Sequence, residues 1–259
     1  MQSFTITAGD TALITGATAG IGLEFSRELA SRGIQLVLVA RNAERLQNVS
    51  EELQQAYGIN VEVVVADLSL RNDCDVVASR AAQPNIQLVV NNAGFGLNQS
   101  FFEDSVESEQ ALLDVLVNSV MRVTHSALSV MKERNRGGVI NVSSVAGWMT
   151  SGTYSAAKSW VTVFSESLAK QLENSPVHVM ALCPGFTRTE FQDRAGMRTD
   201  TIPNWMWLDA NKVVKKGLID FQAGKPVSVP GAQYKMLSFI ARHFPRSIVR
   251  SLSVRSRRK

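Results

Sequence analysis

Short runs of apolar residues alternate with longer amphipathic stretches along most of the chain. Each run is apolar at successive positions, which is typical of strands covered by helices on both faces. These runs predict strands at residues 11–15, 35–40, 61–66, 88–91, 138–143, 178–183 and, as a short last strand, 227–229. Helical periodicity predicts helices at residues 20–32, 42–57, 70–82, 107–134, 153–173 and 210–222. The alternation indicates an α/β fold: a doubly wound, seven-stranded parallel sheet flanked by helices.

The alternation stops between about residues 186 and 208. This stretch contains Pro203 and the cluster Trp205-Met206-Trp207, and it is long for a connection inside an α/β unit. We predict that it forms a lid over a substrate site. No repeat or linker-like change of composition interrupts the chain, and 259 residues, 45% of them apolar, suit one large domain.

The apolar runs exclude some classes of protein. None approaches the ~18 residues that a membrane-spanning helix needs, and the first residues lack the features of a secretory signal. Cys74 and Cys183 lie far apart and form no CxxC pair, and the three histidines show no metal-ligand spacing. We therefore expect a reduced, cytoplasmic chain without a metal site or a disulfide framework.

The net charge of +4 is unevenly distributed. Asp220 is the last acidic residue and nine basic residues follow it; the other 18 basic and 23 acidic residues leave residues 1–220 at −5. A nucleic-acid-binding face is therefore not expected on the body of the protein. The tail, about residues 234–259, mixes basic with apolar residues. Two interpretations stay open: peripheral contact with an anionic membrane, or a C-terminal helix packed on the body with a basic end.

A glycine-rich loop, residues 15–22, follows the first predicted strand and leads into an amphipathic helix. Residues without a Cβ let the backbone approach a pyrophosphate, and free N–H groups at a helix N-terminus face the anion. The spacing is not GxGxxG, so an ordinary glycine-rich turn is the alternative. We predict that the dinucleotide-binding residues of this loop are Gly16, Thr18, Ala19, Gly20, Ile21 and Gly22.

The end of the second predicted strand bears on the choice of cofactor. NAD sites usually carry an acid there, which binds the ribose 2′-hydroxyl. Here the strand ends in Val39-Ala40 and is followed by Arg41 and Asn42. An arginine can pair with a 2′-phosphate, whereas a merely solvated arginine is unfavourable near the positive end of a helix. We therefore expect NADP(H).

Tyr154 and Lys158 lie four residues apart in a predicted helix, so they share one face of it. A lysine ammonium beside a phenol favours the phenolate, so we expect the pKa of Tyr154 to be lowered. Such a phenol can exchange a proton with a developing alkoxide. Ser144, at the end of the preceding strand, can hydrogen-bond the carbonyl oxygen while a nicotinamide supplies hydride. The Tyr-x-x-x-Lys pair alone is a weak signal, and it gains weight from the motifs around it.

Further motifs follow one another in a fixed order. They are Asp67-Leu68, Asn91-Asn92-Ala93-Gly94, Asn118, Ser144, Tyr154, Lys158 and Pro184-Gly185. With residues 15–22, these motifs make the chain resemble the short-chain dehydrogenase/reductase family over nearly its whole length. The resemblance is to the ketoacyl-reductase-like branch. It implies a Rossmann fold, with residues 1–259 as one dinucleotide-binding catalytic domain, and reduction of a ketone or 3-oxoacyl carbonyl with NADPH.

The resemblance also implies roles on the adenosine side of the cofactor. Asp67 would bind the adenine amino group, with Leu68 beside it in the binding site. Asn91, Ala93 and Gly94 would line the adenine ribose and shape the end of the central strand. A strand-end cap and a simple turn are the structural alternatives for these residues.

On the nicotinamide side, the resemblance implies a proton relay and a set of positioning groups. Asn118 would hold a water that links Lys158 to solvent, and Lys158 would also bind the nicotinamide ribose. Pro184, Gly185 and Thr189 would position the carboxamide and flank the phosphates. A buried polar group of a helix is the structural alternative for Asn118.

Two features depart from the family pattern. The interval between serine and tyrosine is shorter than usual, and the shortening falls at residues 148–153, which should border the substrate. Ser143 and Ser144 are adjacent, and alternation sends their side chains to opposite sides. We choose Ser144 because Val145-Ala146-Gly147 follows it directly, as in the family.

Several aromatic residues would form an apolar mouth for a lipophilic carbonyl substrate, with core packing as the alternative. They are Phe95, Trp148, Phe186, Phe191, Trp205 and Trp207. An NADP-dependent dehydrogenase that oxidises a hydroxy acid or a sterol is the alternative function among enzymes. An NADP-binding redox sensor is the alternative outside enzymes, although a sensor would be free to lose Tyr154 or Lys158. The substrate, the direction of reaction and the formation of a homo-oligomer stay open at this point.

Overall fold

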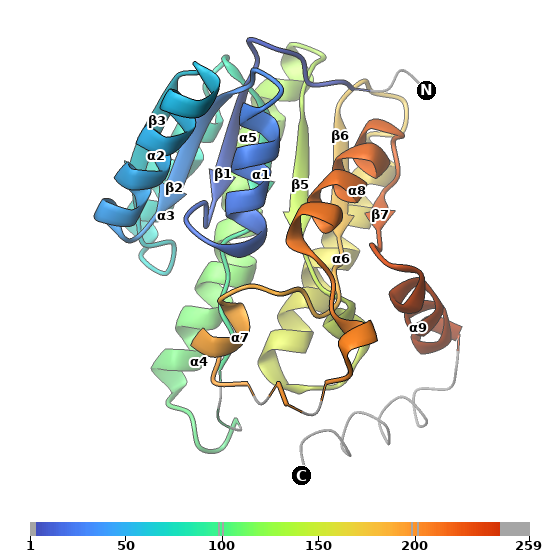
Figure 1. The fold of residues 1–259 in the computed structure, drawn as a ribbon. Helices are drawn as coiled ribbons and strands as arrows, with labels where there is room; N and C mark the ends of the chain where they lie inside the picture. The colour runs from blue at the N-terminus through green and yellow to red at the C-terminus, as the bar shows by residue number, and fades with distance from the viewer. Residues whose placement is uncertain (1–3, 98, 100, 198, 201, 244–259) are drawn as a thin grey trace.

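The computed structural model describes residues 4–97, 99, 101–197, 199–200 and 202–243. They contain one parallel sheet with the strand order β3-β2-β1-β4-β5-β6-β7 (Figure 1). The strands are β1 (Thr11–Thr15), β2 (Gln35–Ala40), β3 (Val61–Val65), β4 (Ile86–Asn91), β5 (Gly138–Val142), β6 (His178–Leu182) and β7 (Val227–Ser228). The order reverses between β1 and β4, so the first residues after these two strands border the crevice where dinucleotides bind in such folds.

Helices cover both faces of the sheet. One face carries α1 (Gly20–Ala30), α2 (Ala43–Tyr57) and α8 (Ala210–Gln222), and the other carries α3 (Arg71–Ala81), α5 (Ser119–Glu133) and α6 (Gly152–Gln171). Three further helices are α4 (Val106–Leu113), α7 (Phe191–Arg194) and α9 (Ala232–His243). In Figure 1, α4 and α7 lie beyond the carboxyl ends of the strands. Both faces are covered, which explains why the strands are apolar at successive positions.

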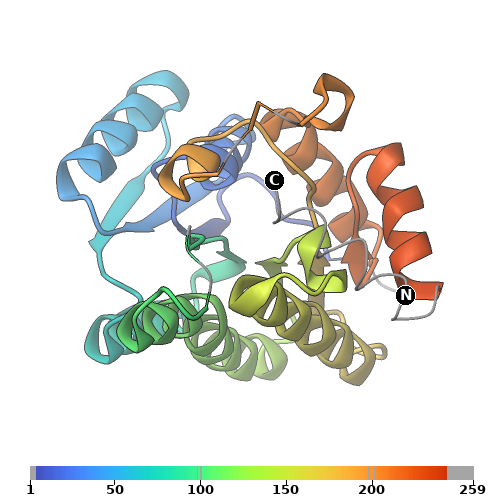
Figure 2. The ribbon, with the colours of Figure 1, turned by 90° about the horizontal axis from the view of Figure 1, so that it is seen from below.

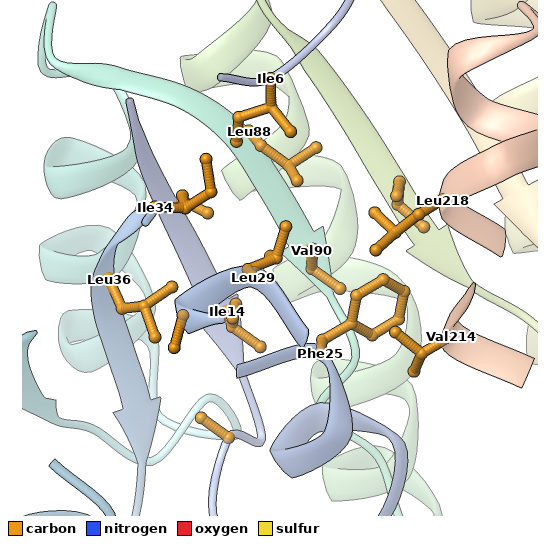
Figure 3. Packing of buried hydrophobic residues seen from close by; sticks show 14 of the residues in the cluster. Ile6, Ile14, Phe25, Leu29, Ile34, Leu36, Leu88, Val90, Val214 and Leu218 are labelled. Carbon is orange, nitrogen blue, oxygen red and sulfur yellow. The ribbon is translucent and has the colours of Figure 1, made fainter. Parts of the chain in front are cut away.

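Alternate residues of each strand enter two separate hydrophobic clusters. Ile14 and Leu36 pack against Phe25 and Leu29 of α1 in the first cluster (Figure 3). Leu13, the neighbour of Ile14 in β1, belongs to the second cluster on the other face. A strand of this sheet therefore buries side chains on both sides, and the carboxyl ends of the strands are left as the place where polar groups gather.

The predicted fold class and the order of elements are confirmed. One correction concerns the helix predicted over residues 107–134. It is divided into α4 and α5 by a π-helical turn at Asp114–Asn118. Such turns insert a residue into the α-helical hydrogen-bond ladder and occur frequently at functional sites. The sequence analysis also missed α7 and the 3-10 turns at Val145–Trp148 and Asn204–Met206.

The segment predicted as a lid, residues 186–208, leaves the sheet and returns to its starting point. Thr187 and Leu208 form an isolated parallel bridge. Leu208 N–H donates to the Phe186 carbonyl (2.8 Å), and Arg188 N–H donates to the Leu208 carbonyl (3.0 Å). Seen from the carboxyl ends of the strands, the segment runs across that end of the molecule (Figure 2). Within the predicted tail, α9 is ordered structure, and residues 244–259 lie outside the described residues.

Candidate active site

The glycine loop joins β1 to α1 at the point where the strand order reverses. Gly16 has a left-handed φ of +66°, and a Cβ there would lie 2.9 Å from Ala93 Cα. A Cβ on Gly22 would lie 2.2 Å from the Gly16 carbonyl oxygen. Any side chain at either position would therefore force the loop away from the sheet. The glycines serve the tight turn and the close packing of helix on strand.

Thr15 and Asn92 hold this loop in place. The Thr15 hydroxyl accepts hydrogen bonds from the backbone N–H groups of Asn92 and Ala93, each at 3.0 Å. The Asn92 amide nitrogen donates to the carbonyls of Thr15 (2.9 Å) and Gly16 (3.2 Å). The sequence analysis gave neither residue a role of its own, although both stand inside the motifs that carried the resemblance.

The start of α1 has the form expected of an anion site. Its N-cap, Ala19, has no side-chain capping bond, so the first N–H groups of α1 have no polar side chain at the cap to accept from them. Gly20 has a φ of +55°, and a Cβ there would lie 3.0 Å from the Thr189 side chain. The loop that contains Thr18 and Ile21 is thus faced by the first residues of the lid segment. A phosphate group would fit against this helix start.

Arg41 and Asp67 come together at the carboxyl ends of β2 and β3. Arg41 Nη1 lies 3.6 Å from Asp67 Oδ2, and the Arg41 side chain is 69% exposed. Burial alone would raise the pKa of Asp67, but hydrogen bonds from Ser69 and the charge of Arg41 hold the pKa below its usual value. Leu68, next in the chain, is buried. The structure therefore brings the two predicted adenosine-side residues together as an ion pair.

Arg45 is a second cation at this end of the sheet, and the sequence analysis missed it. It lies in the first turn of α2, four residues after Arg41. Its guanidinium donates to the Thr18 carbonyl (3.3 Å) and to both carboxylate oxygens of Glu190 (2.8 and 3.1 Å). The hydrogen bond from Arg45 lowers the pKa of Glu190. This ion pair joins the glycine loop to the start of the lid segment.

Ser144, Tyr154 and Lys158 meet beyond the end of β5. The hydroxyls of Ser144 and Tyr154 share a hydrogen bond, and Lys158 Nζ lies 5.8 Å from the centre of the Tyr154 ring. Ser143 points the other way, because its buried hydroxyl bonds the Lys158 carbonyl (2.7 Å) and Thr162 (2.8 Å). Of the two serines, only Ser144 faces the tyrosine.

The protonation of the pair differs from the sequence expectation. Burial raises the pKa of Tyr154 to about 12, and the Ser144 hydrogen bond offsets part of that increase. The expected lowering of the Tyr154 pKa by Lys158 is therefore wrong. Lys158 Nζ donates to the Val142 carbonyl (2.7 Å) rather than to the phenol, and burial lowers the pKa of Lys158 to about 8. Desolvation is the largest influence on the pKa of each group.

Three further predicted residues are Asn91, Asn118 and Gly94. Asn91 is buried and donates to Asn141 Oδ1 (2.8 Å) and Thr124 Oγ1 (3.0 Å), so it ties β4 to β5 and α5. Asn118 ends the π-helical turn with an exposed side chain that donates to Asp114 Oδ1 (2.6 Å). Gly94 lies close to the lysine, since a Cβ there would lie 3.9 Å from Lys158 Nζ.

The loop after β6 completes the site. The Pro184 carbonyl accepts from Val145 N–H at 3.1 Å and lies 3.5 Å from Ser144 Oγ, so this loop is attached to the serine loop. Thr189 follows five residues later beside Gly20. Of the residues predicted for the nicotinamide side, Pro184 is thus attached to the loop of Ser144, Thr189 lies beside the glycine loop, and Asn118 is exposed.

Comparison with known proteins fits this arrangement. The sequence model of the family described as short chain dehydrogenase matches residues 10–199. The chain belongs to the short-chain dehydrogenase family. One relative is 17-beta-hydroxysteroid dehydrogenase type 3 of Rattus norvegicus, 34% identical over 187 residues, which are 70% of this chain and 61% of that protein. Another is the very-long-chain 3-oxoacyl-CoA reductase of Anas platyrhynchos, 32% identical over 190 residues, with the same coverage, 70% and 61%.

A solved structure matches more of this chain. It is titled as a short-chain dehydrogenase from Sphingobium yanoikuyae in complex with NADPH; it is 29% identical, has a TM-score of 0.83, and the match covers 90% of this chain and 93% of that one. The chain spans about three fifths of the length of the curated relatives that it matches.

The predicted aromatic residues surround Tyr154 only in part. The Phe191 ring, from the lid segment, lies 5.8 Å from the Tyr154 ring. Phe186 and Trp207 contact each other at the two ends of the lid segment, also at 5.8 Å. Trp205 is exposed, whereas Phe95 packs against the core clusters. Of the predicted aromatic residues, Phe191 thus lies beside Tyr154, and Phe186 pairs with Trp207 at the base of the lid segment.

Proposed function

We propose that this short-chain dehydrogenase reduces a ketone or 3-oxoacyl-type carbonyl to an alcohol with NADPH. The hydrogen bond between Ser144 and Tyr154, beside the buried Lys158, carries this proposal. These hydroxyls lie at the carboxyl end of β5, and the lid residue Phe191 reaches over from the side of the glycine loop. A carbonyl oxygen placed there would meet both hydroxyls.

The cofactor would supply hydride to the carbonyl carbon. Tyr154 then gives its proton to the oxygen, and Ser144 hydrogen-bonds the same oxygen as charge develops on it. A pKa of about 12 keeps the phenol protonated at neutral pH, which suits a proton donor.

Lys158 and Asn118 would return a proton to the phenol after each turnover. Lys158 has a pKa of about 8, so its proton is exchangeable near neutral pH. Asn118 lies on the same side of the sheet with an exposed amide. We infer that water between these two side chains connects the lysine to solvent. Lys158 would also hydrogen-bond the nicotinamide ribose.

The choice of NADPH rests on the charges beyond β2 and β3. Arg41 is mostly exposed and free to turn toward a 2′-phosphate. Its ion pair with Asp67 is long, with 3.6 Å between Arg41 Nη1 and Asp67 Oδ2. The pyrophosphate would lie against the uncapped start of α1, with Thr189 and Gly185 closing the site. The relative solved with NADPH has the same fold over 90% of this chain, which supports this choice.

The substrate proposed here is lipophilic. The Phe191 ring of the lid lies beside Tyr154, and Phe186 and Trp207 pair at the base of the lid. Relatives of this chain are named for a hydroxysteroid and for a very-long-chain 3-oxoacyl-CoA, which share a large apolar part, the steroid skeleton or the long acyl chain. We infer that a bulky apolar ketone enters beside the lid.

We propose that this cytoplasmic enzyme makes peripheral contact with a membrane, where a lipophilic substrate would be dissolved. Met236 and Phe239 on α9 are each 61% exposed, and Trp205 on the lid is 62% exposed. The basic residues of the tail follow directly in the sequence. Among the described residues, no helix is long and apolar enough to cross a membrane. We infer that α9 and the tail rest on an anionic lipid surface beside the substrate mouth.

The deciding experiment follows NADPH consumption with three classes of substrate: long-chain 3-oxoacyl thioesters, steroid ketones and small ketones. We expect turnover with one or both of the large classes and little with small ketones. Titration of NADPH is run beside it. Cofactor binding without turnover of any substrate would support the redox-sensor alternative instead.

A further inference from the structure

Tyr234 is the most deeply buried tyrosine of the described residues, at 2% exposure, and it comes from α9 near the end of the described chain. Its ring lies against Gly185, since a Cβ on that glycine would lie 2.0 to 2.2 Å from three atoms of the ring. Those distances are far shorter than any real contact, so the ring needs a glycine at this position. The ring thus occupies the space that a side chain of the nicotinamide loop would take.

The hydroxyl of Tyr234 joins the two ends of the lid segment. Phe186 N–H donates to the hydroxyl oxygen at 3.0 Å, and the hydroxyl donates to the Met206 carbonyl at 2.7 Å. Phe186 begins the lid segment and Met206 lies close to its end. One side chain therefore hydrogen-bonds a backbone group near each end of the lid segment.

The helix that carries Tyr234 is itself attached to the other walls of the site. Arg242 donates to Glu166 of α6 (2.9 Å) and lies 5.3 Å from the centre of the Trp148 ring, next to the serine loop. Gln233 Nε2 donates to the Trp205 carbonyl at 3.2 Å. Helix α9 thus provides a fixed support between the loop of Ser144 and the lid.

A movement at the base of the lid would change the contacts that the lid makes with the reacting groups. Phe191, five residues beyond Phe186, contacts Tyr154, and Thr189 contacts Gly20 of the glycine loop. Rigid attachment of the base is therefore what keeps the lid's apolar side over the tyrosine.

We propose that Tyr234 is a positioning residue, which fixes the base of the substrate lid and the Pro184-Gly185 loop relative to Tyr154. The proposal rests on the proposed function only for its kinetic test. Tyr234 acts through the lid and touches neither of the reacting hydroxyls.

The test compares Tyr234→Phe with Tyr57→Phe. Both changes remove one hydroxyl, and Tyr57 is a 42% exposed residue at the end of α2. Removing the Tyr234 hydroxyl leaves two backbone groups of the lid base without their partner, which predicts a KM for a large ketone about tenfold higher. We expect a smaller rise in the dissociation constant of NADPH, because Gly185 and Thr189 also border the proposed cofactor site. Tyr57→Phe should match the wild type in both values.

A second measurement does not depend on activity. Arg188 and Arg194 are exposed sites for trypsin within the lid segment. We expect cleavage at them to be several times faster in Tyr234→Phe, while cleavage elsewhere in the chain and the Tm change little. Gly185→Ala should loosen the lid in the same way, because its Cβ meets the Tyr234 ring.

The outcomes are distinguishable. Faster lid cleavage together with a raised KM supports the proposal, and faster lid cleavage without any turnover in the wild type leaves it standing while the proposed function fails. If Tyr234→Phe and Gly185→Ala both leave lid cleavage and KM at wild-type values, Tyr234 does not position the lid. A uniform rise of cleavage along the whole chain, with a lowered Tm and an unchanged KM, would show a merely structural role and overturn the proposal.

Discussion

Arg41→Ala provides the sharpest test of the cofactor assignment. A buried, charge-assisted pair with a phosphate would contribute about 1.5–3 kcal/mol. Arg41 is 69% exposed, however, and it must leave Asp67, 3.6 Å away, to reach a 2′-phosphate. Solvent screening reduces such interactions to about 1 kcal/mol or less, so we expect a loss of NADPH affinity of up to about fivefold.

Titration of intrinsic tryptophan fluorescence with NADPH and NADH measures this loss. The difference between wild type and variant should shrink at high salt, because ions screen an exposed pair. NADH affinity should change little, since NADH has no 2′-phosphate.

Arg71→Ala is a matched control for this experiment. The Arg71 side chain is 73% exposed and also lies 3.6 Å from its partner, Asp75. It should bind NADPH as the wild type does. Equal losses of NADPH affinity in the two variants would show that the loss comes from the net charge of the protein and not from a contact of Arg41. A wild type that prefers NADH would refute the assignment of Arg41.

Four further outcomes follow from the site and the tail. Tyr154→Phe should abolish turnover and leave NADPH affinity nearly unchanged, because it removes the proton donor; near-normal rates would end the proposed mechanism. Ser144→Ala should reduce kcat far more than Ser143→Ala, since only Ser144 bonds the tyrosine; the reverse order would mean that the wrong serine was chosen. Burial lowers the pKa of Lys158 from 10.5 to about 8, so the unfolded chain binds more protons than the folded chain between those two pH values. The free energy of unfolding of the protein without cofactor should therefore rise with pH in this range. A Lys158→Met variant should lack this rise, and parallel profiles for the two proteins would contradict the prediction. The full chain should co-sediment with anionic vesicles at low salt and less at high salt or when the chain ends at Ser253, whereas a protein that stays in the supernatant in every case favours the packed-helix alternative.

The sequence alone was enough for the elements and for the chemistry of single motifs. The strands were predictable because uninterrupted apolar runs of strand length have few other stable arrangements once helices cover both faces. The glycine loop was predictable because Gly16 and Gly22 stand where a Cβ would collide with backbone. Tyr154 and Lys158 were predictable as a pair because helical spacing alone brings them to one face.

The tertiary structure decided what depends on contacts between distant segments. The sequence could not give the pKa of Tyr154, because burial, not the neighbouring lysine, dominates it. Nor could it show that Arg45 reaches Glu190, 145 residues away. The π-helical turn before Asn118 was also hidden, because an inserted residue hardly changes the hydrophobic pattern.

Tyr234 shows the same limit most clearly. In the sequence it is one aromatic residue in an amphipathic, basic tail, with no motif around it. Its role depends on the absence of a side chain at Gly185 and on two backbone groups of the lid, which folding alone brings within 3.0 Å of its hydroxyl. Local patterns determine which elements form, because propensity and spacing act over a few residues. Packing determines which of them meet, because burial and hydrogen bonding act between whichever groups the fold places in contact.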